Sequence, residues 1–173
     1  MAAHRPGDTF GPVELDVHPD LAALSFLLGT WRGSGRGEYP TIDPFPYDEE
    51  VVVEHVGEPF LLYRQSSWSP DDGEPLHLER GFLRPGLAHG EVELCLAHPI
   101  GLTEIAHGVV DGSTLELSTT RNGVVGRTRT GLEVTALSRT YRVEGDRLTY
   151  ELFMATERTP STLHLRAELR RLP

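Results

Sequence analysis

The chain has 173 residues and a net charge of −10, with 26 acidic residues against 16 basic ones, all of which are arginine. A chain of this length fits one domain, its acidic balance argues against nucleic acid as a partner, and the absence of lysine excludes P-loop and Schiff-base chemistry. The single cysteine, Cys95, allows no internal disulfide and gives no zinc motif.

The first 17 residues are mostly polar and contain no basic segment followed by an apolar one, the pattern that directs secretion. No apolar run in the chain approaches the roughly 20 residues that a membrane span requires. We therefore expect residues 1–17 to form a flexible segment and residues 18–173 to form the folded domain. We also expect the protein to be cytoplasmic, with no membrane partner.

A short helix is predicted at the start of the domain, in the stretch HPDLAALSFLLG (18–29). Asp20 precedes a run of apolar side chains and is predicted to be the N-cap, and Gly29 is predicted to end the helix.

Ten segments with alternating or β-branched apolar residues come next, separated by turn formers such as Asp111-Gly112 and Asn122-Gly123. The predicted strands are 29–37, 49–56, 59–69, 76–84, 90–98, 102–110, 113–120, 132–143, 147–156 and 161–171. Short strands joined by tight turns favour an all-β antiparallel meander, and ten of them can close into an up-and-down barrel. The interior of such a barrel is wider than its own side chains can fill, which predicts an internal ligand cavity.

The first predicted strand, GTWRGSGRG, places Gly29, Gly33 and Gly35 around Trp31. Glycines let a strand bend sharply and let another backbone or a ligand approach closely. We interpret the stretch mainly as the closure of the barrel, with Trp31 filling one end. Direct contact with a ligand is the alternative interpretation.

The ordered segments GTWRGSG, YPTI, EEVVVEHVG, GEPFLLYRQ, LAHPIGLTEIAHG, LEVTALSRTYRV and HLRAELRR resemble the nitrobindin family of haem-binding β-barrels, over about residues 20 to 171. The resemblance implies a ten-stranded barrel, similar to lipocalins and fatty-acid-binding proteins, with the short N-terminal helix closing one end and one ferric haem b per chain in its cavity. It also implies that the protein binds nitric oxide and isomerises peroxynitrite to nitrate.

Two residues match positions at which this family contacts haem. The resemblance implies that His164 is the axial ligand of the haem iron and the residue central to catalysis, and that Thr41 touches the haem. An ordinary turn hydroxyl beside Pro40 is the alternative for Thr41. Of the other histidines, three are predicted to be half-exposed strand residues and one to hydrogen-bond a turn: His55, His77, His107 and, in the turn, His98.

Strict alternation along STLHLRAELRR (161–171) conflicts with a ligand role for His164. It places Leu163 and Leu165 on one face of the strand and His164 on the opposite, polar face. If the apolar face points inward, His164 points to solvent. The conflict is resolved either by a β-bulge that turns His164 inward or by a homodimer in which the leucines pack outside the barrel.

Two other classes of function stay open on the residues alone. One is a non-enzymatic intracellular carrier of a fatty acid or another apolar small molecule, held in the same cavity. The other is an interaction domain whose cavity is filled by its own side chains. No Ser/His/Asp order, metal-ligand spacing or pair of carboxylates stands out, so the sequence gives no basis for a hydrolase.

Overall fold

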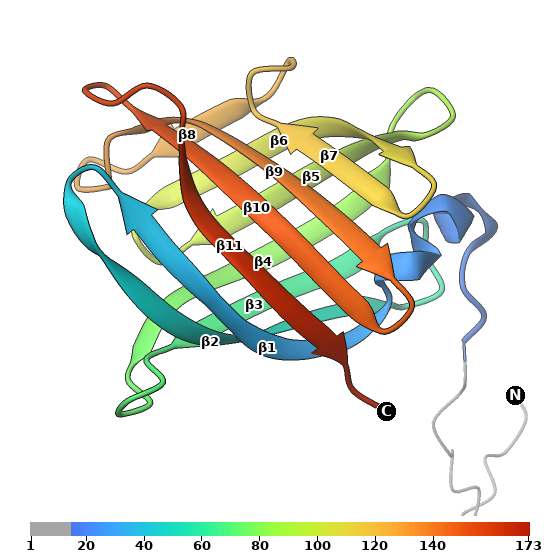
Figure 1. The fold of residues 1–173 in the computed structure, drawn as a ribbon. Coiled ribbons are helices and arrows are strands. Elements are labelled where there is room, and N and C mark those ends of the chain that lie inside the picture. The colour runs from blue at the N-terminus through green and yellow to red at the C-terminus, as the bar shows by residue number, and fades with distance from the viewer. Residues whose placement is uncertain (1–14) are drawn as a thin grey trace, which may run out of the picture.

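The computed structural model describes residues 15–173, which form an antiparallel β-barrel with one short helix at one end (Figure 1). Residues 1–14 of the predicted N-terminal segment lie outside the described residues, so its boundary at residue 17 stays a prediction. Within residues 15–173 the only helix has nine residues, too few to cross a bilayer.

The strands follow one another around the barrel and pair antiparallel throughout. The elements in chain order are η1 (Pro19–Leu27), β1 (Gly29–Tyr39), β2 (Ile42–His55), β3 (Leu61–Trp68), β4 (Pro75–Pro85), β5 (Glu91–His98), β6 (Leu102–Asp111), β7 (Thr114–Ser118), β8 (Val124–Arg127), β9 (Val134–Glu144), β10 (Arg147–Thr156) and β11 (Thr162–Arg171). Pairing of β1 with β11 and of β5 with β6 closes the ring. The predicted all-β barrel is therefore confirmed.

Strands β7 and β8 pair with successive parts of β6 and so share one position beside it. The eleven strands therefore occupy ten positions around the barrel. The sequence predicted no strand at β8, since the glycine- and arginine-rich stretch around it has the composition of a loop. Strand β2 begins seven residues earlier than predicted, and the early part contains Pro44 and Pro46. These prolines are tolerated because the pairing of β2 with β3 starts only at Asp48, which leaves the early part paired on one side.

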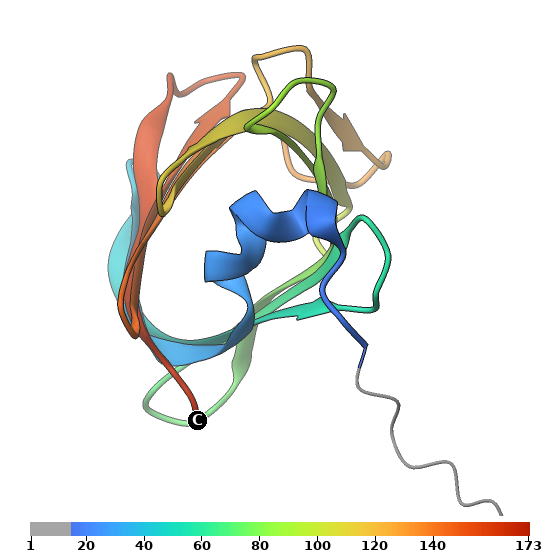
Figure 2. The ribbon, with the colours of Figure 1, turned by 90° about the vertical axis from the view of Figure 1, so that its right-hand side faces the viewer.

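Helix η1 closes one end of the barrel (Figure 2). Its leucines Leu21, Leu24 and Leu27 are buried against Trp31 of β1, whose indole Nε1 donates a hydrogen bond to the Leu27 carbonyl oxygen at 2.8 Å. The helix begins at Pro19 and its N-cap is His18, so the predicted cap at Asp20 is wrong. Proline fits the first helical position without losing a hydrogen bond, and this moves the start of the helix ahead of the apolar run.

The glycines of β1 lie where the strand contacts both of its neighbours. A β-carbon on Gly33 would lie 2.2 Å from the Glu168 carbonyl oxygen in β11, and one on Gly35 would lie 2.3 Å from the Tyr47 ring. Gly29 has a φ of +121° where the chain passes from η1 into the strand. These contacts lie within the barrel wall and favour the closure interpretation of GTWRGSGRG.

The inward-facing residues change character along the barrel axis. Next to η1 they are apolar, as with Val51, Leu83 and Leu169, and they form the core. Farther along the same strands they become polar, as with Glu49 and Glu79, although these side chains are also buried. The end of the barrel beyond this polar layer is where a cavity lies.

Candidate functional site

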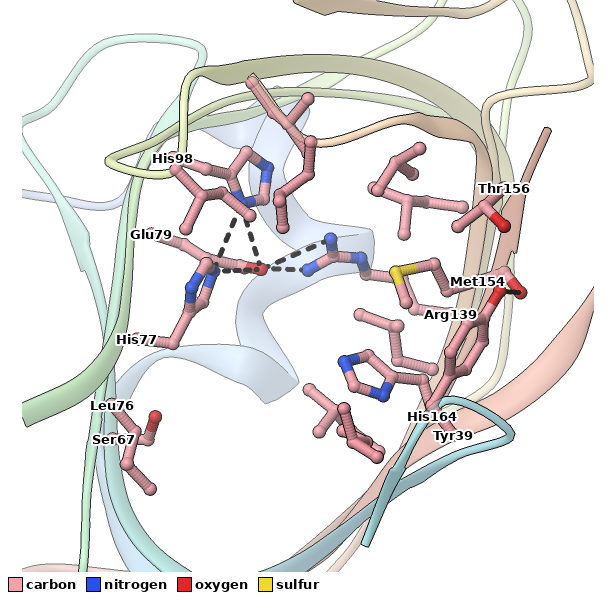
Figure 3. Close-up of a pocket in the computed structure, with 18 of the residues that line it drawn as sticks. Tyr39, Ser67, Leu76, His77, Glu79, His98, Arg139, Met154, Thr156 and His164 are labelled. Atoms are coloured by element: carbon pink, nitrogen blue, oxygen red, sulfur yellow. Dashed lines mark hydrogen bonds and ion pairs between the residues drawn. The ribbon is translucent and has the colours of Figure 1, made fainter. Parts of the chain in front are cut away.

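A cavity of about 540 Å³ opens at the end of the barrel opposite η1 (Figure 3). This volume is in the range of small-molecule sites. Its mouth is formed by side chains next to the turns at that end: Thr41, Leu76, Ile100, Leu132 and Thr156. Apolar side chains line part of the wall farther in, among them Phe45, Leu152 and Leu165.

His164 faces this cavity because β11 has a β-bulge at that residue. Leu152 of β10 pairs with Leu165, while the next residue, Phe153, pairs with Leu163, so His164 is the extra residue between them. The bulge places both His164 and Leu165 in the cavity wall and leaves Leu163 on the outer face with the exposed Phe153. The structure thus resolves the alternation conflict by a bulge, with no need for a second copy of the chain.

The imidazole of His164 is held in one orientation. Its Nδ1 lies 3.0 Å from the Glu38 carbonyl oxygen, which can only accept, so Nδ1 donates and Nε2 carries no hydrogen in the neutral ring. Burial lowers the pKa of His164 and favours that neutral form. The Tyr39 ring packs edge-on against the imidazole with the ring centroids 5.4 Å apart. Figure 3 shows the ring projecting into the cavity, where its free Nε2 can bind a metal ion.

Thr41 lies in the turn between β1 and β2 and is exposed at the cavity mouth. The structure therefore brings both residues suggested by the family resemblance, Thr41 and His164, to one cavity. Among the described residues that line it, none belongs to the set Gly29, Trp31, Gly33 and Gly35. These four residues lie in the wall and at the closed end of the barrel.

The opposite wall carries a polar group that the sequence analysis did not identify (Figure 3). His77 and Glu79 of β4 and His98 of β5 meet there, with His77 Nε2 and His98 Nδ1 3.2 Å apart. The side chain of His98 is 3% exposed and faces inward, so its predicted role in a turn is wrong. Two signals could have found the group: His77 and Glu79 are two residues apart on one strand face, and His98 shares its face with the buried Leu94 and Leu96.

Arg139 of β9 connects this group to a second buried carboxylate. Its Nη1 lies 2.8 Å from Glu79 Oε2, and its Nη2 lies 2.5 Å from Glu104 Oε2. Burial by itself would raise the pKa of Glu79, but the Arg139 guanidinium holds that pKa well below its ordinary value. The Arg139–Glu79 pair therefore stays ionised inside the barrel.

The floor of the cavity is a chain of hydrogen-bonded side chains that continues from Arg139. Tyr63 donates to Gln65 Oε1 at 2.8 Å, and Gln65 Nε2 donates to Glu49 Oε2 at 2.5 Å, a carboxyl oxygen that also accepts from Tyr150 at 3.0 Å. Burial raises the pKa of Glu49 to about 8. The floor separates the cavity from the apolar core next to η1.

Comparison with known proteins identifies the family. Residues 20–171 match the model of the THAP4-like, heme-binding β-barrel domain. The chain is 53% identical over 160 residues to Peroxynitrite isomerase 2 of Mycobacterium ulcerans and 52% identical to Peroxynitrite isomerase 1 of Mycobacterium tuberculosis, covering 90% of this chain and 97% of each relative.

A solved structure agrees with the fold described above. The crystal structure of Rv2717c from M. tuberculosis superposes with a TM-score of 0.87 at 52% sequence identity, over 91% of this chain and all of that one. Sequence and structure agree over nearly the whole barrel. The chain therefore belongs to the THAP4-like heme-binding β-barrel family.

Proposed function

We propose that the protein is a haem-dependent peroxynitrite isomerase that converts peroxynitrite to nitrate and also binds nitric oxide. Support comes from relatives with this name that share about half of their residues with the chain over most of its length. The observation that carries the proposal is the bulge in β11, which directs a neutral, singly hydrogen-bonded imidazole into a cavity of suitable size.

The residues of the cavity fit a haem. His164 would hold the haem iron through Nε2, and apolar side chains such as Phe45, Leu152 and Leu165 would suit contact with a porphyrin. In this proposal His164 would hold one ferric haem b per chain, and Thr41 would contact it at the mouth of the cavity. When bound, the haem supplies an iron centre that acts as a Lewis acid toward a peroxide-type oxygen.

The protein side chains supply orientation and electronic tuning. Donation from His164 Nδ1 to the Glu38 carbonyl fixes the ring and makes the imidazole a stronger electron donor. Tyr39 limits rotation of the ring, because its hydroxyl donates to the Met154 carbonyl oxygen at 3.3 Å while its ring packs on the imidazole. Apolar side chains such as Leu152 and Leu165 line the same cavity as His164 and would limit the access of water to its ligand side.

Titration of the haem-free protein with ferric haem tests the proposal. Wild type should bind one equivalent with the intense visible band of a ligated haem, and His164→Ala should lose most of this affinity. His107→Ala is the matched control, since His107 is a strand histidine on the outer face of the barrel that pairs with Glu93 at 3.9 Å. Equal haem uptake by wild type and His164→Ala, or loss of uptake in His107→Ala, would contradict the assignment. Uptake of fatty acid without haem would instead support the carrier function.

The proposal includes a cytoplasmic location. A homodimer is a separate prediction that light scattering on the purified protein can check.

A further inference from the structure

We propose that His77, Glu79 and His98 form a binding site for one divalent transition-metal ion, such as Zn²⁺ or Fe²⁺, in the cavity wall that faces His164. One ligand atom from each of these two imidazoles and one carboxylate lies within 4.8 Å of the other two. The site does not depend on haem and is not part of the proposed isomerase function. Figure 3 shows the three side chains and His164 on opposite sides of the cavity.

The distances between the three ligand atoms suit a metal ion. His77 Nε2 lies 3.2 Å from His98 Nδ1, and Glu79 Oε1 lies 3.7 Å from His77 Nε2 and 3.5 Å from His98 Nδ1. With bonds of about 2.0–2.2 Å, the ligands of a tetrahedral metal lie about 3.4 Å apart. The observed separations lie on either side of this value, so an ion can be bound with little movement of the side chains.

The second nitrogen of His98 is positioned as in metal-binding histidines. Among the described residues, the buried His98 Nε2 has no hydrogen-bond partner, yet it lies 3.5 Å from Glu104 Oε2. When Nδ1 binds a metal, Nε2 carries the hydrogen and can donate it to this carboxylate. A carboxylate that accepts from the far nitrogen of a histidine ligand is a regular feature of metal sites, because it fixes the ring and increases its basicity.

The charges around the three side chains favour a cation. Glu79 and Glu104 are both nearly fully buried, and a single guanidinium, that of Arg139, lies between them. Apart from the two histidines, this group therefore has two carboxyl groups and one guanidinium. Arg139 contacts Glu79 mainly through Oε2, at 2.8 Å against 3.5 Å for Oε1, which leaves Oε1 available to an ion.

The three ligands are held on adjacent strands, which gives the site a fixed geometry. The pairing of β4 with β5 extends to Arg80 and Ala97, so Glu79 and His98 are next to each other across the strand pair. Three protein ligands leave at least one coordination position open, and all three side chains line the cavity. Two histidines and one carboxylate with open positions are typical of catalytic zinc and non-haem iron sites.

Titration of the haem-free protein with Co²⁺ tests this inference. We expect one equivalent to bind with the strong visible absorption of cobalt in a low-coordinate nitrogen and oxygen site, and we expect Zn²⁺ to displace it. Glu104→Gln should weaken binding by about 10- to 100-fold, the usual effect of removing a partner of a ligand. His77→Ala and His98→Ala should weaken binding further.

Two matched variants serve as controls. His107→Ala removes a histidine that pairs with a glutamate on the outer face, and His164→Ala removes the other cavity histidine, so both should bind Co²⁺ as wild type does. His77 is 25% exposed, so His77→Ala is expected to stay folded and decides the test if His98→Ala does not fold. Absence of a stoichiometric cobalt spectrum in wild type, wild-type affinity in His77→Ala, or loss of binding in His164→Ala would each overturn the proposal.

Discussion

At the scale of single residues, the chemistry of the cavity depends on which atoms already have a hydrogen-bond partner. His164 has one nitrogen bonded to the Glu38 carbonyl and one without a hydrogen-bond partner among residues 15–173, so a single ligand position faces the cavity. Across from it, Glu79 has one oxygen paired closely with Arg139, and His98 has a nitrogen next to Glu104. The two walls therefore offer two separate sets of donor atoms.

The buried Glu49 predicts a specific dependence of stability on pH. Its pKa is about 8 in the folded protein against an ordinary value of 4.5, so between these pH values the folded state keeps a proton that the unfolded chain has lost. The stabilising contribution is complete below pH 4.5 and disappears as pH rises through 8, at about 1.4 kcal/mol per pH unit. Glu49→Gln lacks this titration. The free energy of unfolding of Glu49→Gln relative to that of wild type should therefore rise by about 1.4 kcal/mol for each pH unit between 4.5 and 8.

Urea unfolding of both proteins at pH 5, 6 and 7 measures this difference. Glu54→Gln is the control, because Glu54 lies on the same strand, is exposed and shows no such burial. Parallel stability profiles for wild type and Glu49→Gln would mean that the Glu49 carboxyl is ionised in the folded protein at pH 5 to 7.

Three residues of the site show what the sequence could and could not predict: His164, His98 and Arg139. His164 was found only through the family resemblance, since alternation alone placed it on the solvent side. His98 and Glu79 are 19 residues apart, and the chain alone does not tell which strands pair or in which register. Arg139 was missed because arginine is rarely buried without partners, and both of its partners come from other strands.

At the scale of the secondary-structure elements, the bulge in β11 determines which side chains reach the cavity. A bulge is defined by the partner strand, here β10, so a single segment read by itself cannot predict it. The strands themselves were predictable because alternation is local to each one. Only the short β8 and the proline-containing start of β2 were missed, and both depend on pairing with neighbours.

Paired substitutions on either side of the bulge test the orientation of β11. Leu163→Arg places a charge on the outer face and should change stability by no more than about 0.5 kcal/mol. Leu165→Arg places the charge in the cavity wall and should cost about 1–3 kcal/mol and reduce haem uptake. Thermal unfolding and haem titration of the two variants provide the measurement. A loss in Leu163→Arg as large as that in Leu165→Arg would indicate regular alternation without a bulge, because both side chains would then share the inner face.

The close contacts of β1 predict that its glycines cannot accept side chains. Gly33→Val would force a side chain against the backbone of β11, and Gly35→Val would force one against the Tyr47 ring, each at a cost of about 1–3 kcal/mol. Trp31→Ala should cost about 3–5 kcal/mol because it leaves a cavity beneath η1.

Ser34→Val is the matched control for these variants, since Ser34 lies between the two glycines on the exposed face. The melting temperature of the haem-free protein should fall by about 2–4 °C for each kcal/mol lost, and Ser34→Val should melt like wild type. Unchanged melting of Gly33→Val and Gly35→Val together with weaker haem binding would show that the glycines contact the ligand.

At the scale of the whole molecule, the barrel divides into an apolar half under η1 and an open half with chemically active groups, separated by a buried polar floor. The first half provides the core, and its regular alternation is the reason the fold was predictable. In the second half, His164 and the buried glutamates occupy positions that are apolar in the first half. Alternation predicted the wrong orientation for His164 and did not identify the glutamates. The part of the barrel that carries the candidate functional groups is thus also the part that the sequence predicted least well.

The most direct test of the central claim is the conversion of peroxynitrite by the haem-loaded protein, followed by stopped-flow absorbance with the nitrate yield measured at the end. Wild type and His107→Ala should accelerate the decay of peroxynitrite equally and in proportion to haem content, with nitrate as the main product. His164→Ala, given the same total haem, should show no acceleration beyond that of free haem. Decay at the uncatalysed rate with haem-loaded wild type, or full acceleration with His164→Ala, would contradict the account.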